Sequence, residues 1–202
     1  MTKARAMQPL ASGLADPVFG SQIVFRTVLD ALSAPGKIFD LSDNLAGTPA
    51  KLPPAAATLL LTLADYETPV WLQSEDQETR RWLSFHTGAP KASAPSEARF
   101  AVIDGAASSA RLGDFNLGED RYPDTSTTIL VLCDALEGGL PVALTGPGIK
   151  GSTRFAPRGL DASLWREIAD NNAMYPLGVD LIFVAGSQLA GLPRSTQIGG
   201  GL

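Results

Sequence analysis

The sequence has very little of the chemistry that most active sites use. Its 202 residues include one cysteine, Cys133, and one histidine, His86. A lone cysteine cannot close a disulfide within the chain, and one histidine with one cysteine cannot supply the usual ligand sets for zinc. Cys133 ends the apolar run 127–133, which favours a small core residue over a nucleophile. The sequence therefore predicts no metal held by this chain alone and no site built around a thiol.

Long hydrophobic runs and clusters of basic residues are also missing. The longest apolar stretch, at 55–64, is far shorter than the roughly 20 residues of a membrane-spanning helix, and no export-signal pattern is visible. The net charge is −5, and the 16 basic residues are scattered. A strong electrostatic attraction to nucleic acid is therefore not expected. We expect a cytoplasmic chain that binds neither membrane nor nucleic acid.

What is present indicates one globular α/β domain. Apolar content of 45% and charged content of 18% are typical of a chain that buries a core. Helical spacing predicts helices that begin at Asp16 and Pro17, within 51–54, at Gln77 and at Asp161. Apolar runs predict strands at 70–72, 99–103, 127–133, 141–145, 179–185 and 189–193. We expect a mixed β-sheet covered by helices over residues 17–198, a flexible arm at 1–16 and a frayed end at 199–202.

Two details of this architecture can be predicted more closely. In the first helix, the apolar residues at helical spacing, and hence the expected buried face, are Val18, Phe25, Val28, Leu29 and Leu32. Arg26 falls outside that face and is expected in solvent or at an interface. Short glycine-containing turns predict two β-hairpins, one joining 127–133 to 141–145 and one joining 179–185 to 189–193.

A glycine-rich turn at 146–151 has the spacing of a dinucleotide-binding fingerprint. The turn contains Gly146, Gly148, Lys150 and Gly151, but proline and glycine soon after it disfavour the helix that such a site needs. The lysine precedes the last glycine, so the turn is not a P-loop either. Backbone N–H groups with Lys150 and Arg154 nearby remain able to contact an anion. One hypothesis is therefore a free-standing enzyme that binds a nucleotide or a phosphonate at this turn.

Other polar residues allow both a structural and a functional interpretation. His86 either hydrogen-bonds the backbone at a helix end or lines a pocket or a subunit contact, and no Gly-x-Ser-x-Gly elbow accompanies it. Asp180 and Arg194 face each other across a predicted hairpin, either as a structural pair or as part of an anion site. None of the five lysines lies in a pattern typical of Schiff-base chemistry. The chain is thus predicted to have no self-sufficient active site.

Seven segments in order resemble the PhnH family of the bacterial carbon–phosphorus lyase system. They are Phe25-Arg26 with 31–36 (Ala-Leu-Ser-Ala-Pro-Gly), 59–65 (Leu-Leu-Leu-Thr-Leu-Ala-Asp), 68–72 (Thr-Pro-Val-Trp-Leu), 85–90 (Phe-His-Thr-Gly-Ala-Pro), 144–149 (Leu-Thr-Gly-Pro-Gly-Ile), 176–182 (Pro-Leu-Gly-Val-Asp-Leu-Ile) and 192–196 (Leu-Pro-Arg-Ser-Thr). The resemblance covers about residues 17–198. Two departures from the family pattern are Ser195, where threonine is frequent, and Gly151.

The resemblance implies a role in phosphonate catabolism. PhnH-like proteins act with the G, I and L subunits in a transferase step in which a phosphonate displaces the adenine of ATP, giving α-D-ribose 1-methylphosphonate 5-triphosphate. The family implies a homodimer within a core complex with PhnG, PhnI and PhnJ. It also implies a fold similar to that of pyridoxal-phosphate-dependent transferases, without the cofactor, while ATP and Mg²⁺ belong to the complex.

The resemblance implies no catalytic residue in this chain. It carries over only motif positions that are candidates for pocket or subunit contacts, namely Arg26, His86, Asp180 and Arg194. We therefore expect an accessory subunit without activity of its own.

Overall fold

A central six-stranded sheet organises the chain, which we describe from a computed structural model over residues 10–49, 51–74, 76–107 and 110–199. The strand order is β1-β8-β7-β4-β3-β2. Neighbouring strands are parallel from β2 to β7, and β8 is antiparallel to both β7 and β1. The strands are β1 (Ile38–Asp40), β2 (Val70–Leu72), β3 (Phe100–Asp104), β4 (Thr128–Leu132), β7 (Asp180–Ala185) and β8 (Gln188–Leu192). The expected mixed sheet is confirmed.

A second, three-stranded sheet has the order β6-β5-β9. Its strands are β5 (Val142–Thr145), β6 (Thr153–Phe155) and β9 (Gln197–Gly199), all antiparallel. The predicted hairpin between 127–133 and 141–145 is therefore wrong. Both edges of β4 are taken by parallel neighbours, β3 and β7, so β4 has no edge left for β5. The hairpin predicted for 179–185 and 189–193 is confirmed as β7 and β8.

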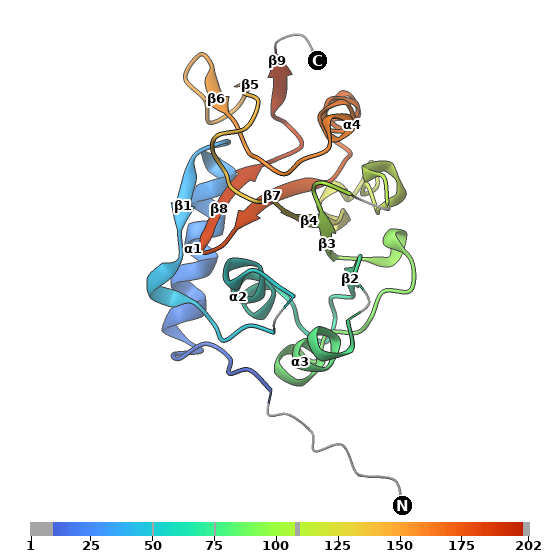
Figure 1. The fold of residues 1–202 in the computed structure, drawn as a ribbon. Coiled ribbons are helices and arrows are strands. Elements are labelled where there is room, and N and C mark those ends of the chain that lie inside the picture. The colour runs from blue at the N-terminus through green and yellow to red at the C-terminus, as the bar shows by residue number, and fades with distance from the viewer. Residues whose placement is uncertain (1–9, 50, 75, 108–109, 200–202) are drawn as a thin grey trace, which may run out of the picture.

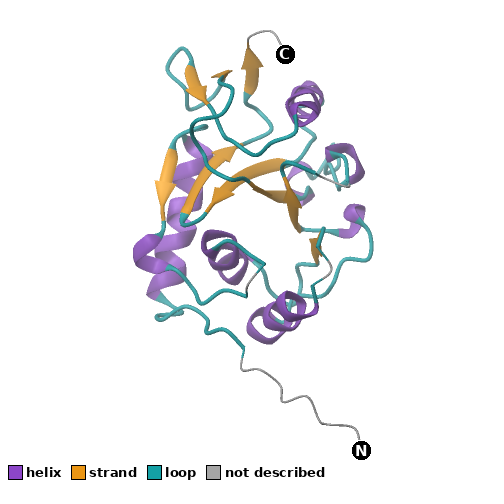
Figure 2. Ribbon diagram, viewed as in Figure 1, coloured by secondary structure: helices purple, strands orange, loops and turns teal. Residues whose placement is uncertain are grey.

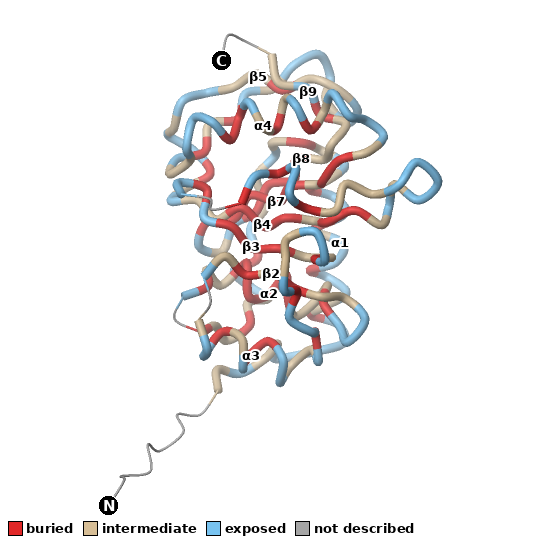
Figure 3. The backbone as a smooth tube through the Cα atoms, turned by 90° about the vertical axis from the view of Figure 1, so that its right-hand side faces the viewer, coloured by how far each residue is buried: buried red, intermediate tan, exposed pale blue. Residues whose placement is uncertain are grey.

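Layers of other elements cover the two faces of the large sheet (Figures 1 and 2). Helices α1 (Phe19–Ser33), α2 (Pro54–Leu63) and α3 (Gln77–Thr87) lie on one side, and α4 (Ala162–Ala173) lies with the small sheet on the other. Buried residues concentrate along β3, β4, β7 and β8, between the layers (Figure 3). Strands buried on both faces read as continuous apolar runs, which is why β4 and β7 are easy to predict from sequence.

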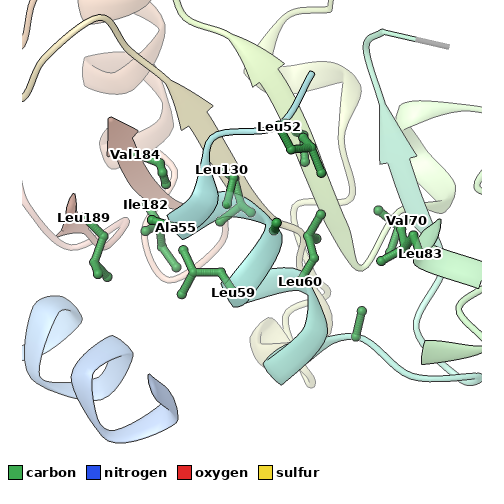
Figure 4. Close-up of a cluster of buried hydrophobic side chains, with 14 of the residues drawn as sticks. Leu52, Ala55, Leu59, Leu60, Val70, Leu83, Leu130, Ile182, Val184 and Leu189 are labelled. Atoms are coloured by element: carbon green, nitrogen blue, oxygen red, sulfur yellow. The ribbon is translucent and has the colours of Figure 1, made fainter. Parts of the chain in front are cut away.

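Helix α2 is the central element of one hydrophobic core (Figure 4). Its residues from Ala55 to Leu60 are all buried, including Leu59, which is fully enclosed. The small side chains Ala55, Ala56 and Ala57 let the helix pack closely on the sheet, where it meets the side chains of Leu130, Ile182 and Val184. Helix α2 is therefore buried on nearly all sides, as its apolar sequence requires.

The exposed face of α1 differs from the prediction. The helix begins at Phe19, two residues after the predicted first residue Pro17. In the turn before it, Asp16 Oδ1 accepts hydrogen bonds from the N–H groups of Val18 at 3.0 Å and Phe19 at 2.9 Å. The buried face, however, consists of Gly20, Val24, Val28 and Ala31. Of the predicted face only Val28 is fully buried, whereas Val18, Phe25 and Leu29 are exposed by 72%, 48% and 51%.

The reason for this difference is a close approach between α1 and β8. A Cβ atom on Gly191 of β8 would lie 2.5 Å from the carbonyl oxygen of Ala31. Only the face with small residues fits at that separation. The bulkier apolar residues therefore point outward, on the side of the helix that also carries Arg26.

The two ends of the chain lie partly outside the described residues. Of the predicted arm, residues 1–9 are not described, while Leu10 and Ala11 pack against the core that contains α2. Of the predicted frayed end, Gly199 pairs with Ala143 in the small sheet, and residues 200–202 are not described. Within the described ranges, no helix has the length and apolar character to cross a bilayer.

Candidate functional site

Asp180 and Arg194 meet where β7 begins and β8 has ended. The antiparallel register pairs Leu181 with Leu192 and so brings the two residues together. Arg194 Nε lies 3.1 Å from Asp180 Oδ1, and Arg194 Nη2 lies 2.5 Å from Asp180 Oδ2. The backbone N–H of Arg194 also donates to Oδ1, at 2.9 Å. The arrangement is a bidentate, charge-assisted pair.

The remaining N–H groups of Arg194 are also engaged within the protein. Nη1 donates to the carbonyl oxygens of Pro123 at 2.8 Å and Pro176 at 3.5 Å, and Nη2 donates to Ser126 Oγ at 2.5 Å. A guanidinium has five N–H donors, and each of them has a protein oxygen. The side chain is only 12% exposed. This supports the structural interpretation of the pair, in which Arg194 holds the 123–126 segment against the sheet.

His86 lies on α3 and contacts the N-terminal segment. Its Nε2 is 3.0 Å from the carbonyl oxygen of Ala11, which also accepts a hydrogen bond from Trp82 Nε1 at 3.0 Å. The imidazole packs edge-on against the rings of Trp82 and Phe85. His86 therefore bonds a backbone carbonyl, as one of the two interpretations expected, but the carbonyl belongs to a distant segment.

The glycine turn joins two antiparallel strands. It connects β5 to β6, so no helix follows it and the arrangement of a dinucleotide-binding site is absent there. Gly146, Gly148 and Gly151 have φ values of 126°, 80° and 77°. Lys150 lines a hollow of about 430 Å³ beside the end of α1. Lys37 lines the same hollow, and the sequence pattern alone did not predict that these two lysines would meet. Arg154, on β6, is exposed and is not among the residues of this hollow.

A separate cavity of about 450 Å³ opens at the carboxyl ends of β2, β3 and β4. It is lined by apolar residues together with the polar residues Lys51, Gln73, Ser74, Asp76, Thr79 and Asp104. The side chain of Gln73 closes one wall by donating to Ala107 O at 2.7 Å and accepting from Asp104 N at 3.1 Å. Parallel α/β sheets commonly bind ligands at this edge, so the strand order would have predicted the cavity, but that order was not deduced from the sequence.

Neither a metal centre nor a reactive thiol is found among the described residues. No group of three or more His, Cys, Asp or Glu side chains is placed to hold a metal ion in that part of the chain. Burial raises the pKa of the Cys133 thiol from 9.0 to about 12. A thiol that is protonated at neutral pH is a poor nucleophile. Cys133 is partly buried and packs against the core from its edge, rather than lying inside it as predicted.

Comparison with known proteins identifies the family of this chain. The PhnH family, described as bacterial phosphonate metabolism proteins, matches residues 12–199. The chain belongs to the PhnH family.

Two relatives have informative names. The α-D-ribose 1-methylphosphonate 5-triphosphate synthase subunit PhnH of Rhizobium meliloti (strain 1021) is 41% identical over 196 residues, covering 95% of this chain and 96% of the relative. The putative C-P lyase subunit protein HtxG of Stutzerimonas stutzeri is 32% identical over 179 residues, covering 88% of this chain and 85% of the relative. Both PhnH-family relatives are thus named as subunits.

The segments that resemble the PhnH family act mainly as turns and braces. Gly36 lies in the turn after α1 with φ at 77°, and its N–H donates to Gly191 O at 3.0 Å. Gly88 ends α3 with φ at 70°. Thr68 braces its own turn through hydrogen bonds with Asp65. In these segments, the two glycines and Thr68 have structural roles in turns.

Proposed function

We propose that this chain is a subunit of an α-D-ribose 1-methylphosphonate 5-triphosphate synthase in the carbon–phosphorus lyase pathway. The observation that carries the proposal is the 41% identity to the Rhizobium meliloti PhnH subunit over nearly the full length of both chains. The step is a transfer in which a phosphonate displaces the adenine of ATP. Such a pathway operates on small polar metabolites, which fits a cytoplasmic protein.

In this proposal the chain is an accessory subunit without activity of its own. The two most distinctive polar groups of the sequence, Arg194 and His86, bind the protein's own oxygens in the structure. Groups that fix the fold are not available to abstract a proton or to stabilise a transition state. ATP and Mg²⁺ would be bound by the assembled complex.

The exposed face of α1 is the surface that best supports a subunit contact. We call the set Val18, Phe19, Ile23, Phe25 and Leu29 the α1 apolar face; each is at least 48% exposed. Arg26 and Asp30 lie exposed on the same side of the helix. Arginine within a set of aromatic and aliphatic residues is typical of interface cores. We propose that this face serves the homodimer and its assembly with PhnG, PhnI and PhnJ.

We also propose a likeness to pyridoxal-phosphate-dependent transferases in fold only, with no cofactor on this chain. Lys37, Lys51, Lys91 and Lys150 are all exposed, whereas a Schiff-base lysine is normally held in a desolvated pocket. The purified chain should show no internal-aldimine absorption after incubation with pyridoxal phosphate. A stable aldimine band would contradict this part of the proposal.

Co-expression tests the proposal directly. This chain should elute with PhnG, PhnI and PhnJ as one species in size-exclusion chromatography. Elution of this chain on its own, with all three partners present and soluble, would overturn the subunit role.

The alternative is a free-standing enzyme that uses the glycine turn. It rests on the hollow that Lys150 shares with Lys37. This alternative predicts release of adenine from ATP and methylphosphonate by the isolated chain, whereas the subunit proposal predicts none.

A further inference from the structure

We propose that the hollow between the end of α1 and the β5–β6 turn binds a small tetrahedral oxyanion, the phosphonate or phosphate group of a ligand. We call it the two-lysine hollow. It is lined by Ala34, Pro35, Lys37, Gly148, Ile149, Lys150, Ser152 and Thr153. The inference rests on the proposed function only for the choice of methylphosphonate as a test ligand.

The charge of the two-lysine hollow is the first argument. Lys37 and Lys150 are distant in sequence, yet both line it, and no aspartate or glutamate in the described ranges does. Among the residues that the structure describes, neither lysine has a carboxylate partner within ion-pair distance. Two cations on one concave surface repel each other, and a bound anion would relieve that repulsion. Such a local excess of positive charge is notable in a chain of net charge −5.

The two-lysine hollow is also rigid. A Cβ atom on Gly148 would lie 2.0 Å from the carbonyl oxygen of Ser33, so the turn is pressed against the end of α1. Lys37 is held from the other side, with its Nζ 5.0 Å from the centroid of the Phe39 ring. Because the turn is held against the end of α1, the backbone of this part of the hollow needs little ordering on binding.

Hydrogen-bond donors complete the two-lysine hollow. Ser152 and Thr153, whose side chains carry hydroxyls, line it beside the lysines. In the described chain, the backbone N–H groups of Lys150, Gly151 and Ser152 have no protein acceptor, whereas that of Ile149 donates to Gly146 O at 3.1 Å. A turn with successive free N–H groups and glycines of positive φ is a form of anion-binding nest.

The lining favours a small ligand group over a nucleotide base. Among the described residues, no aromatic side chain lines the hollow, so none of them offers a stacking surface to a base there. Pro35 and Ile149 supply apolar contact of the size of a short alkyl group. A volume of about 430 Å³ admits a phosphonate with its alkyl group. We therefore expect methylphosphonate to bind at least as well as inorganic phosphate.

Calorimetric titration of the full-length chain at low ionic strength tests the site with methylphosphonate, inorganic phosphate and tripolyphosphate in separate arms. Saturable binding of methylphosphonate is expected, and Lys37→Gln and Lys150→Gln should each weaken it about tenfold. Lys51→Gln, at a lysine that lines the other cavity, is the matched control and should bind as the wild type does. Tighter binding of tripolyphosphate would assign the site to the polyphosphate end of a ligand.

Two results would overturn the inference. One is the absence of saturable binding in all three arms. The other is unchanged affinity in both lysine variants. The lysines could instead act only by stabilising the carboxyl end of α1, which is the negative end of the helix dipole. In that case the two variants would lower the melting temperature, and the wild type would bind no anion. Both variants should still elute with PhnG, PhnI and PhnJ, so a failed titration and a failed assembly are distinguishable.

Discussion

Arg194 Nη2 lies 2.5 Å from Asp180 Oδ2, and the pair fastens the start of β7 to the chain that leaves β8. The same guanidinium also binds Pro123 O and Ser126 Oγ. One side chain thereby joins three stretches that are distant in sequence. This is a stabilising arrangement only while the charge of Arg194 is balanced, because a partly buried cation without its partner is costly.

Substitution Asp180→Asn should therefore destabilise the protein. The amide keeps one acceptor but removes the negative charge beside a guanidinium that is 12% exposed. We expect a loss of about 2 kcal/mol in the free energy of unfolding, measured by urea denaturation. Asp124→Asn, at an exposed aspartate within the 123–126 segment, is the control and should change little. A loss below ~0.5 kcal/mol for Asp180→Asn would show that the pair is not stabilising.

The sequence predicted this pair but not the surface of α1. The Asp180–Arg194 contact follows from hairpin register, which the short turn after β7 specifies locally. The buried face of α1 depends instead on how closely β8 approaches the helix. Gly191 allows that close approach to Ala31, and the two residues are 160 positions apart in the sequence. Periodicity alone finds apolar residues and cannot tell a core face from an interface face.

A charge substitution in the α1 apolar face should separate assembly from folding. Leu29→Glu places a carboxylate on a side chain that is 51% exposed, so the thermal stability of the chain should hardly change. Co-elution with the partner subunits should be lost, because a charge in an interface core must be desolvated. Tyr122→Glu, at a residue that is 52% exposed and lies outside α1, is the control and should assemble normally. Normal assembly of the Leu29 variant would exclude this face.

The cap of α3 should make stability depend on pH. Asp76 accepts hydrogen bonds from the Thr79 hydroxyl at 2.5 Å and the Thr79 N–H at 3.0 Å. The hydrogen bond from the hydroxyl lowers the pKa of Asp76 below its ordinary value. A lowered pKa in the folded state means that this stabilisation is complete above the unfolded pKa and is lost as pH falls through the folded one.

Asp76→Ala should accordingly cost about 1 kcal/mol at neutral pH, with a gap to the wild type that narrows below about pH 4. Urea denaturation at several pH values measures it. Asp76→Asn keeps an oxygen that caps the helix without ionising, so it should lie close to the wild type at neutral pH. A gap between wild type and Asp76→Ala that is constant down to acid pH would contradict the role of the ionised cap.

Cys133 should be nearly unreactive in the folded protein. With its pKa raised by burial to about 12, it holds roughly a thousandfold less thiolate at neutral pH than an ordinary cysteine. Alkylation by iodoacetamide, followed by mass spectrometry, should be very slow in buffer and fast in urea. Fast alkylation of the folded chain would contradict the burial of the Cys133 thiol.

The candidate sites show a similar limit of prediction. Lys150 and the glycine turn were visible in the sequence, but Lys37 follows α1 and is brought to the turn only because Gly148 packs against Ser33. Likewise, the cavity at the ends of β2, β3 and β4 requires a strand order that local patterns do not contain. Contacts between neighbouring segments of the chain were predictable, and contacts that depend on topology were not.

Reconstitution of the synthase reaction tests the subunit role most directly. Purified G, I and L subunits with ATP, Mg²⁺ and methylphosphonate would be assayed for adenine release, with and without this chain, and this chain would also be assayed alone. We predict that adenine is released when all subunits are present, that release falls to background when this chain is omitted, and that this chain alone releases none. Undiminished release without it, or adenine release by the chain alone, would contradict the account.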